Sequence, residues 1–433
     1  MTPAARLSAA IEVLTDIESR RRPAGDALKD WGLSHRFAGS GDRAAIAGLV
    51  YDALRRRASS AWLMGEATPR AVVIGMLRRE RGLQREAIER LFDGARFAPP
   101  PLTDSEKDAL EKGSLEGAPA HVAGDYPEWL DPQFAAVLGE ARAEEGAALA
   151  ARAPVDLRVN TLKGNRDDAL AELSDLAPEP TRWSPVGLRI KLGAEAKAPP
   201  LHAETAFIKG LVEIQDEGSQ LAALLAGAKP GEQVIDLCAG GGGKTLALAA
   251  AMENHGQIYA TDTDKRRLAP IHERLERAGV RNVQVRPLKA TADTVADLAG
   301  RADLVLIDAP CTGTGSWRRN PDAKWRIRPG ALEQRRKEQA AILDRAVGLL
   351  KPNGRIVYIT CSLLDDENGA QIRAFLGRQP DFRPVPPEEV IKALGERGFL
   401  FRRAVLASDE GLLMTPRRTD TDGFYVSILA RSA

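Results

Sequence analysis

The stretch from Gln233 to Thr245 constrains the fold most, because it has the pattern of a strand, a glycine turn and a helix start in direct succession. Its first residues, Gln233 to Cys238, are mostly apolar and include the β-branched Val234 and Ile235, as is typical of a buried parallel strand. The four glycines from Gly240 to Gly243 allow a sharp turn and a close approach of the backbone to a ligand. The alanine- and leucine-rich residues from Lys244 onward predict a helix. This succession predicts a nucleotide-type binding corner.

A second predicted strand, Gln257 to Thr261, ends in Asp262, about 20 residues beyond the glycine turn. An acidic side chain at this place binds ribose hydroxyls in Rossmann-like units, so we expect an adenosine-type ligand. A P-loop is an alternative, because Gly243-Lys244-Thr245 fits the end of that motif. The P-loop motif requires a glycine where Cys238 stands, which makes a P-loop NTPase the weaker interpretation.

Composition sets broad limits on the chain. Its 433 residues, 44% hydrophobic and 28% charged, predict two or three globular domains. The formal charge of +1 neither favours nor excludes a nucleic acid partner, since arginines can cluster locally. The 3 cysteines are too few and too scattered for a disulfide framework or a zinc site, so we expect no metal and a reducing cytoplasm. We find no signal peptide and no apolar run of the roughly 20 residues that span a membrane, and we expect a cytoplasmic monomer.

The N-terminal part of the chain is predicted to be all-helical. Apolar side chains recur at helical spacing within residues 1–96, for example in 4–17 and 42–57. Arginine clusters such as Arg55 to Arg57 fit phosphate contacts and solvated helix ends equally well. Residues 97–124, which contain Pro99-Pro100-Pro101, are predicted to be a linker.

The remaining residues predict a mixed segment and an α/β domain. Residues 125–209 form the mixed segment, a small α+β subdomain whose clearest strand is Pro154 to Lys163. From 210 to 433 strands alternate with helices, which predicts a Rossmann-like, mostly parallel sheet with helices on both faces. Two final strands, at 412–415 and 423–430, lack a helix-length connection and predict an antiparallel hairpin.

All three cysteines lie at predicted strand ends, where ligands bind in an open parallel sheet. Cys238 ends the first strand, Cys311 follows the strand 302–308, and Cys361 ends the strand 355–360. A free cysteine is usually a small buried hydrophobic residue, and we interpret Cys238 in this way. If the last two of these strands are neighbours, Cys311 and Cys361 face one crevice beside the adenosine pocket.

These motifs resemble those of a known family. Asp308-Ala309-Pro310-Cys311-Thr312-Gly313-Thr314-Gly315 and Thr360-Cys361-Ser362, with Glu367-Asn368 shortly after, resemble the two cysteine motifs of the Nop/Sun family of RNA cytosine-5 methyltransferases. Asp236 to Lys244 resembles that family's S-adenosylmethionine motif. Further matches are Arg158-Val159-Asn160, Gln215-Asp216-Glu217 and Arg318-Arg319-Asn320-Pro321-Asp322. The resemblance covers roughly residues 125–433, and the helical N-terminus is similar to the NusB-like RNA-binding domain of the bacterial ribosomal-RNA members.

The resemblance implies an S-adenosylmethionine-dependent enzyme that forms 5-methylcytosine in RNA, with small-subunit ribosomal RNA as the expected partner. Cys361 matches the nucleophile that adds to the cytosine ring, Cys311 matches the residue that assists release, and Asp308 is expected to bond the base. The residues expected at the cofactor are Cys238, Ala239, Gly240, Gly241, Gly242, Gly243, Lys244, Asp262 and Asp308. The residues expected at RNA are Arg158, Asn160, Arg318, Arg319 and Lys324.

The sequence also departs from the family pattern. Gly240-Gly241 replace the usual Ala-Pro, and Gly369 follows Asn368 where a second glutamate is common. No acidic residue follows the third strand within 286–289, and Asp293 is too distant to assign to adenine. Acidic residues just beyond Cys361 would raise the pKa of its thiol and a helix N-terminus would lower it, and the sequence leaves this open. A non-catalytic RNA-binding factor for ribosome assembly on the same fold is the second alternative.

Overall fold

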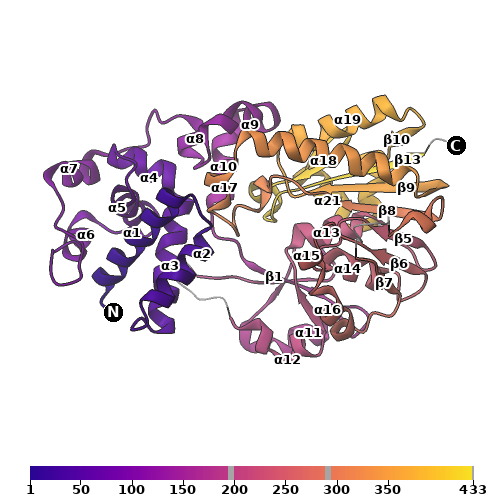
Figure 1. The fold of residues 1–433 in the computed structure, drawn as a ribbon, viewed down its shortest axis with the longest axis horizontal. Coiled ribbons are helices and arrows are strands. Elements are labelled where there is room, and N and C mark those ends of the chain that lie inside the picture. The colour runs from indigo at the N-terminus through magenta and orange to yellow at the C-terminus, as the bar shows by residue number, and fades with distance from the viewer. Residues whose placement is uncertain (194–198, 288–293, 432–433) are drawn as a thin grey trace. The chain divides into compact units, whose positions relative to one another are not determined.

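The computed structural model describes residues 1–193, 199–287 and 294–431. Asp293 lies outside the described residues. The chain divides into two compact units, one of residues 1–152 with 317–327 and one of residues 153–316 with 328–433 (Figure 1). The first unit therefore includes a short piece of chain from the middle of the predicted catalytic domain.

The first unit is helical, as predicted. Thr2 caps its first helix with a hydrogen bond from the Ala5 amide, and Pro3 occupies the first turn, where a missing N–H costs nothing. One apolar core contains residues from most of these helices, among them Val13, Ile46 and Ile74. The helices are α1 (Pro3–Arg20), α2 (Ala24–Ser34), α3 (Ser40–Arg55), α4 (Arg57–Met64), α5 (Pro69–Arg79), α6 (Arg85–Leu91), α7 (Asp104–Lys112), α8 (Ala120–Ala123), α9 (Asp131–Leu138), α10 (Arg142–Ala150) and α17 (Ala323–Arg326).

The predicted linker at 97–124 is a folded part of this unit. It contains α7 and α8, and Thr103 and Glu106 form a capping box at the start of α7. Leu102 and Leu110 are buried in the helical core. The three prolines at 99–101 gave the signal of a linker, but they form only the short connection that precedes α7.

A small antiparallel sheet opens the second unit. Its strands are β1 (Val155–Val159), β2 (Glu179–Pro180), β3 (Gly187–Ile190) and β4 (Val212–Ile214), in the order β2-β3-β1-β4. The helices α11 (Arg166–Glu172) and α12 (Thr205–Ile208) lie between strands in the chain, and apolar residues of strands and helices form one cluster that includes Leu157, Ala169 and Phe207. The predicted strand 154–163 corresponds to the shorter β1.

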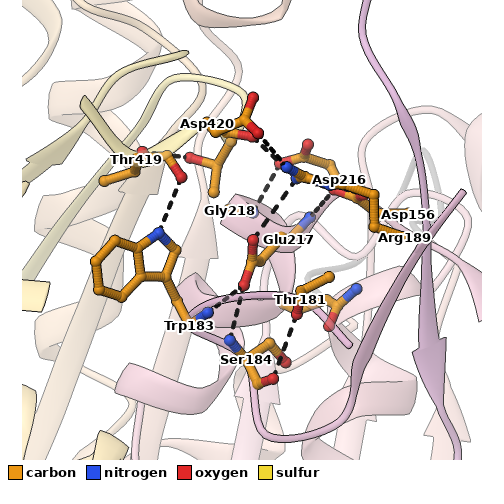
Figure 2. Close-up of polar contacts among 12 residues, drawn as sticks. Asp156, Thr181, Trp183, Ser184, Arg189, Asp216, Glu217, Gly218, Thr419 and Asp420 are labelled. Carbon is orange, nitrogen blue, oxygen red and sulfur yellow. Dashed lines mark hydrogen bonds and ion pairs between the residues drawn. The ribbon is translucent and has the colours of Figure 1, made fainter. Parts of the chain in front are cut away.

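Polar contacts join this small sheet to the C-terminal part of the same unit (Figure 2). The Arg189 guanidinium donates to both carboxylate oxygens of Asp156, at 2.7 and 2.9 Å, and also to Asp420. The indole N–H of Trp183 donates to the Thr419 carbonyl at 2.9 Å. The Glu217 carboxylate accepts from the backbone amides of residues 183 and 184. Because most of these groups are buried, the contacts fix the small sheet to the larger domain.

The large sheet has the predicted Rossmann-like arrangement. Eight strands follow the order β11-β12-β13-β9-β8-β5-β6-β7, and β10 pairs with β13. The pairs from β9 to β7 are parallel, and the pairs that involve β10 to β13 are antiparallel, as expected for the terminal hairpin. The strands are β5 (Gln233–Asp236), β6 (Gln257–Ala260), β7 (Val283–Val285), β8 (Ala302–Asp308), β9 (Leu350–Thr360), β10 (Phe382–Pro384), β11 (Leu406–Ser408), β12 (Gly411–Met414) and β13 (Phe424–Arg431).

Helices cover both faces of this sheet. Figure 1 shows α18 and α19 on one side and α13 and α14 on the other. Apolar residues of α13 and α14, such as Leu221 and Leu248, pack with Val234, Leu304 and Val357 of the strands. The helices are α13 (Glu217–Leu225), α14 (Gly243–Ala251), α15 (Lys265–Leu268), α16 (Ile271–Ala278), α18 (Pro329–Val347), α19 (Gly369–Arg378), α20 (Pro387–Val390), α21 (Arg397–Ala404) and α22 (Pro416–Thr419). In the described ranges no helix combines the length and the apolar character that crossing a membrane requires.

Candidate active site

The order of the strands places the candidate site. β5 pairs with β6 on one side and with β8 on the other, so the chain reverses its winding direction between β5 and β8. The carboxyl ends of strands at such a switch point form the ligand-binding crevice of open α/β sheets. The glycine turn follows β5, and the two cysteine loops follow β8 and β9.

The glycine turn requires glycine at two of its four positions. Gly240 has φ 50° and Gly242 has φ 83°, which is the left-handed region that other residues avoid. A Cβ on Gly242 would lie 2.5 Å from Cγ1 of Ile271 in α16. The turn therefore packs tightly against α16 and leads directly into α14 at Gly243.

Asp262 holds this turn from the end of β6. Its Oδ2 accepts a hydrogen bond from the Gly240 amide at 2.9 Å, and its Oδ1 accepts one from the Asp264 amide at 2.8 Å. The side chain is thus fixed where a Rossmann-like unit places its ribose-binding carboxylate. The ribose contact itself stays a prediction.

The surroundings raise the pKa of two groups at the end of β5. Burial raises the pKa of Asp236 to about 7, although its Oδ2 accepts a 2.7 Å hydrogen bond from the Thr245 hydroxyl. Burial, together with the nearby Asp236, raises the pKa of the Cys238 thiol well above its ordinary value. A protonated thiol is a poor nucleophile, so Cys238 fits the interpretation of a small packing residue.

Lys244 contacts the end of β8. Its ammonium donates to Oδ2 of Asp308 at 2.7 Å and lies 5.0 Å from the centre of the Phe424 ring. The Lys244 side chain is 8% exposed and that of Asp308 is 35% exposed. The sequence predicted both residues for the site, but gave no signal that they form an ion pair with each other.

Cys311 and Cys361 lie side by side. β8 and β9 are parallel neighbours in which Asp308 pairs with Ile359, so the loops that follow them start at the same edge. The two sulfur atoms are 3.4 Å apart. The hydrogen bond with Cys361, and then burial, raise the pKa of Cys311 well above its ordinary value. The structure thus brings together the two cysteines that the sequence placed at one crevice.

The two cysteine loops are also bonded to each other through the backbone. The Gly315 amide donates to the Cys361 carbonyl at 2.9 Å, and the Leu363 amide donates to the Thr314 hydroxyl at 2.8 Å. Gly315 packs so closely on Gly423 that an added Cβ would lie 2.2 Å from the Gly423 carbonyl oxygen. These contacts hold the two loops against each other.

Two residues predicted to bind RNA are buried in the second unit. Arg158 is 4% exposed, and burial lowers its pKa to about 10. Asn160 is 4% exposed, and its amide donates to the carbonyls of Gly210 and Ala278, each at 2.9 Å. The Asn160 side chain thus links the small sheet to α16, and the predicted contact with RNA does not fit the burial of either residue.

The other three predicted RNA contacts lie in the segment 317–327 of the helical unit. Lys324 is 1% exposed and donates to the Arg55 carbonyl at 2.8 Å, and burial lowers its pKa to about 7. Arg318 is 4% exposed, and its carbonyl accepts from the Arg55 guanidinium. Burial therefore argues against phosphate contacts by Arg318 and Lys324, whereas Arg319 is exposed and its contact with RNA stays a prediction.

Comparison with known proteins identifies the family. The family described as 16S rRNA methyltransferase RsmB/F matches residues 222–430, and the ferredoxin-like domain of RsmF/B-like methyltransferases matches residues 126–196. The ribosomal RNA small subunit methyltransferase B of Vibrio vulnificus is 31% identical over 336 residues, which cover 76% of this chain and 71% of that protein. The protein of the same name from Salmonella arizonae is 38% identical, but the match covers 65% of this chain and 60% of that protein.

Solved structures agree with this match. The crystal structure of PH0851 superposes with a TM-score of 0.70 and 26% identity, and the match covers 99% of each chain. The similarity therefore extends over the helical unit as well as the sheet. The chain belongs to the RsmB/F family of ribosomal RNA methyltransferases.

Proposed function

We propose that this methyltransferase forms 5-methylcytosine in small-subunit ribosomal RNA through a covalent bond between Cys361 and the cytosine ring. The observation that carries the proposal is the 3.4 Å separation of the Cys311 and Cys361 sulfurs at the ends of adjacent strands. Two thiols at one crevice suit a reaction that needs one sulfur to add to the ring and a second group to assist its departure.

The glycine turn and its surroundings fit S-adenosylmethionine, the methyl donor of this family. The positive-φ glycines present backbone rather than side chains to a ligand, and the start of α14 offers N–H groups. Residues 238–244 would bind the amino acid part, and Asp262 the ribose. When bound there, the cofactor would supply an electrophilic methyl group.

The protein's own groups perform the remaining steps. Carbon 5 of cytosine is a poor nucleophile, so the Cys361 thiolate first adds to carbon 6, and the new bond makes carbon 5 electron-rich. Carbon 5 takes the methyl group. A base then removes the proton from carbon 5, and the electrons of that bond restore the ring double bond as Cys361 leaves as thiolate. We assign this step, in which the carbon 5 proton is lost and Cys361 departs, to Cys311.

Asp308 is the residue that we assign to orientation of the base. Lys244 holds its Oδ2, so Oδ1 would accept a hydrogen bond from the cytosine amino group. The cytosine must leave its stack to reach the crevice, which favours a single-stranded or loop target. Arg319, which is exposed, would contact the RNA backbone.

Incubation with methyl-labelled S-adenosylmethionine and unmodified small-subunit ribosomal RNA tests the proposal. We expect multiple turnovers and label only at carbon 5 of cytosine, mapped by nuclease digestion and mass spectrometry. Label at another atom would refute the assignment. Stoichiometric RNA binding without methyl transfer would instead identify an assembly factor that uses a methyltransferase fold.

A further inference from the structure

We propose that Glu367 and Asn368 are positioning residues that together set the separation of the two cysteines. The proposal rests on the proposed function, since it assigns the pair a part in the same reaction. Both side chains are buried, with Glu367 0% and Asn368 3% exposed. They are consecutive in the chain, with Glu367 at the end of the short turn Asp365–Glu367 and Asn368 directly before α19.

Asn368 holds the loop of Cys361 on both sides. Its amide nitrogen donates to the carbonyl of Ser362 at 2.9 Å, and its amide oxygen accepts from the hydroxyl of Thr360 at 2.5 Å. These partners are the residues directly after and directly before Cys361. One side chain therefore fixes both backbone neighbours of the proposed nucleophile.

Glu367 holds the loop of Cys311 in the same manner. Its Oε1 accepts from the Thr312 amide at 2.8 Å and its Oε2 accepts from the Thr312 hydroxyl at 2.5 Å. The amide nitrogen of Gln339 in α18 donates both to Glu367 Oε1, at 3.1 Å, and to the Pro310 carbonyl, at 3.0 Å. Both neighbours of Cys311 are thus fixed, one directly and one through Gln339.

The backbone of the pair is itself anchored. The Tyr358 hydroxyl, on β9, donates to the Glu367 carbonyl at 2.7 Å. Because one short piece of backbone carries both side chains, any shift of one cysteine loop relative to the other must break hydrogen bonds of a buried polar group. Such a loss is costly for a group that bulk solvent cannot reach. The pair therefore resists a change in the sulfur–sulfur distance.

The reach of the Glu367 side chain, rather than its charge, carries this role. Glutamine at 367 can keep the contacts with Thr312 and Gln339, because its oxygen accepts from the Thr312 and Gln339 nitrogens while its NH2 donates to a reversed Thr312 hydroxyl. Aspartate keeps the charge but is one methylene too short, and alanine removes all contacts. The three substitutions separate geometry from electrostatics, including the effect of the Glu367 charge on the Cys311 thiol.

The first experiment needs neither RNA nor cofactor. The purified full chain is treated with the oxidant diamide, and the Cys311–Cys361 disulfide is quantified over time by peptide mass spectrometry. We expect the Glu367→Gln variant to form the disulfide at a rate close to that of the unmodified protein. The Glu367→Ala variant should form the disulfide at least tenfold more slowly than Glu367→Gln. Both variants are neutral, so charge cannot explain this difference. Equal rates in the Ala and Gln variants of a folded protein would overturn the proposal.

Asp366→Asn is the matched control for that experiment, because it removes a neighbouring half-buried carboxylate from the same turn. We expect its disulfide to form within about twofold of the unmodified rate. Asn368→Asp places a carboxylate oxygen opposite the Ser362 carbonyl, so it should slow disulfide formation although the side chain keeps its size. Thermal melting shows whether each variant is folded. If Glu367→Ala does not fold, Gln339→Ala replaces it in the comparison, because that substitution removes only the link from Glu367 through Gln339 to the Pro310 carbonyl.

The second experiment uses RNA and separates the two halves of the pair. Glu367→Ala should increase the fraction of protein trapped as a covalent RNA complex, because it disturbs the Cys311 loop. Asn368→Ala should slow formation of that complex, because it disturbs the Cys361 loop. An equal loss of covalent complex in both variants would indicate general destabilisation and would overturn the positioning roles. If unmodified protein forms no covalent complex while the diamide result holds, the proposed reaction fails and the geometric role stands.

Discussion

The ammonium nitrogen of Lys244 lies 2.7 Å from Oδ2 of Asp308, so an ion pair joins the glycine turn to the strand that leads to Cys311. The lysine is nearly buried against Phe424, whereas the carboxylate remains partly open to solvent. This pair links the cofactor side of the crevice to the side where the base is proposed to bind.

Loss of this ion pair should slow methyl transfer without unfolding the protein. Lys244→Met keeps most of the aliphatic stem against Phe424 but leaves Asp308 without its cation. We expect the rate of a single turnover to fall by roughly 10²-fold, the usual size of a lost electrostatic contact in an active site. Rapid-quench measurement of labelled RNA gives this rate. A Lys244→Met enzyme with an unchanged rate would exclude the pair from the reaction.

The two cysteines should respond differently to removal of their sulfur. Cys361→Ala removes the proposed nucleophile, so no covalent RNA complex should form. Cys311→Ala should form the complex and fail to resolve it, so that it accumulates with little free methylated product. Denaturing gels with labelled RNA detect the complex. The opposite pattern would exchange the two roles.

The buried Lys324 predicts a pH dependence of stability. Its pKa in the folded protein is lowered to about 7, whereas the unfolded chain keeps an ordinary value near 10.4. Between these values the unfolded chain binds more protons, so the free energy of unfolding should rise as pH increases from about 7 to about 10. Urea titrations at several pH values measure the rise, and Lys324→Met should flatten it. If the free energy of unfolding of Lys324→Met rose with pH as steeply as that of the unmodified protein, Lys324 would not be the source of the pH dependence.

Gly242 offers a test of the glycine turn. Alanine there would need a positive φ and would place its Cβ 2.5 Å from Ile271 Cγ1. We expect Gly242→Ala to lower the free energy of unfolding by roughly 1–3 kcal/mol and to weaken binding of S-adenosylmethionine, measured by calorimetry. Gly330→Ala in α18 is the control, because an added Cβ there meets nothing within 4 Å. Comparable losses in both variants would count against a specific role for the turn.

Several features of the fold followed from local patterns in the sequence. The apolar run before the glycines and the run before Asp308 became adjacent strands, because burial on both faces leaves a continuous apolar signature. The position of the cysteine pair followed once β8 and β9 were known to be neighbours. The start of β9 was less clear, since Leu350 pairs with Ala302 and the next paired residue is Arg355. The strand was predicted to begin at Arg355, whereas β9 begins at Leu350 and includes Pro352 and Gly354.

Other features could not be read from local patterns because they depend on distant partners. Lys324 and Arg318 carry charges that usually lie on the surface, and only the packing of their segment among the helices buries them. The Lys244–Asp308 pair joins residues 64 positions apart. Glu367 and Asn368 matched a family motif, but their contacts with the two loops required the folded β8 and β9 ends. Long-range pairing of this kind leaves no periodicity in a sequence.

The segment 317–327 has a consequence for any attempt to shorten the protein. Trp325 and Lys324 donate to the carbonyls of Leu54 and Arg55, and Asp322 accepts from the Ala24 amide, so three hydrogen bonds tie the excursion to α2 and α3. A fragment that begins at residue 153 would strip Lys324 and Trp325, which lie 13 and 14 residues after Cys311, of their surroundings. The N-terminal helices are thus no detachable module, and their excision would reach the loop of Cys311 through the chain itself.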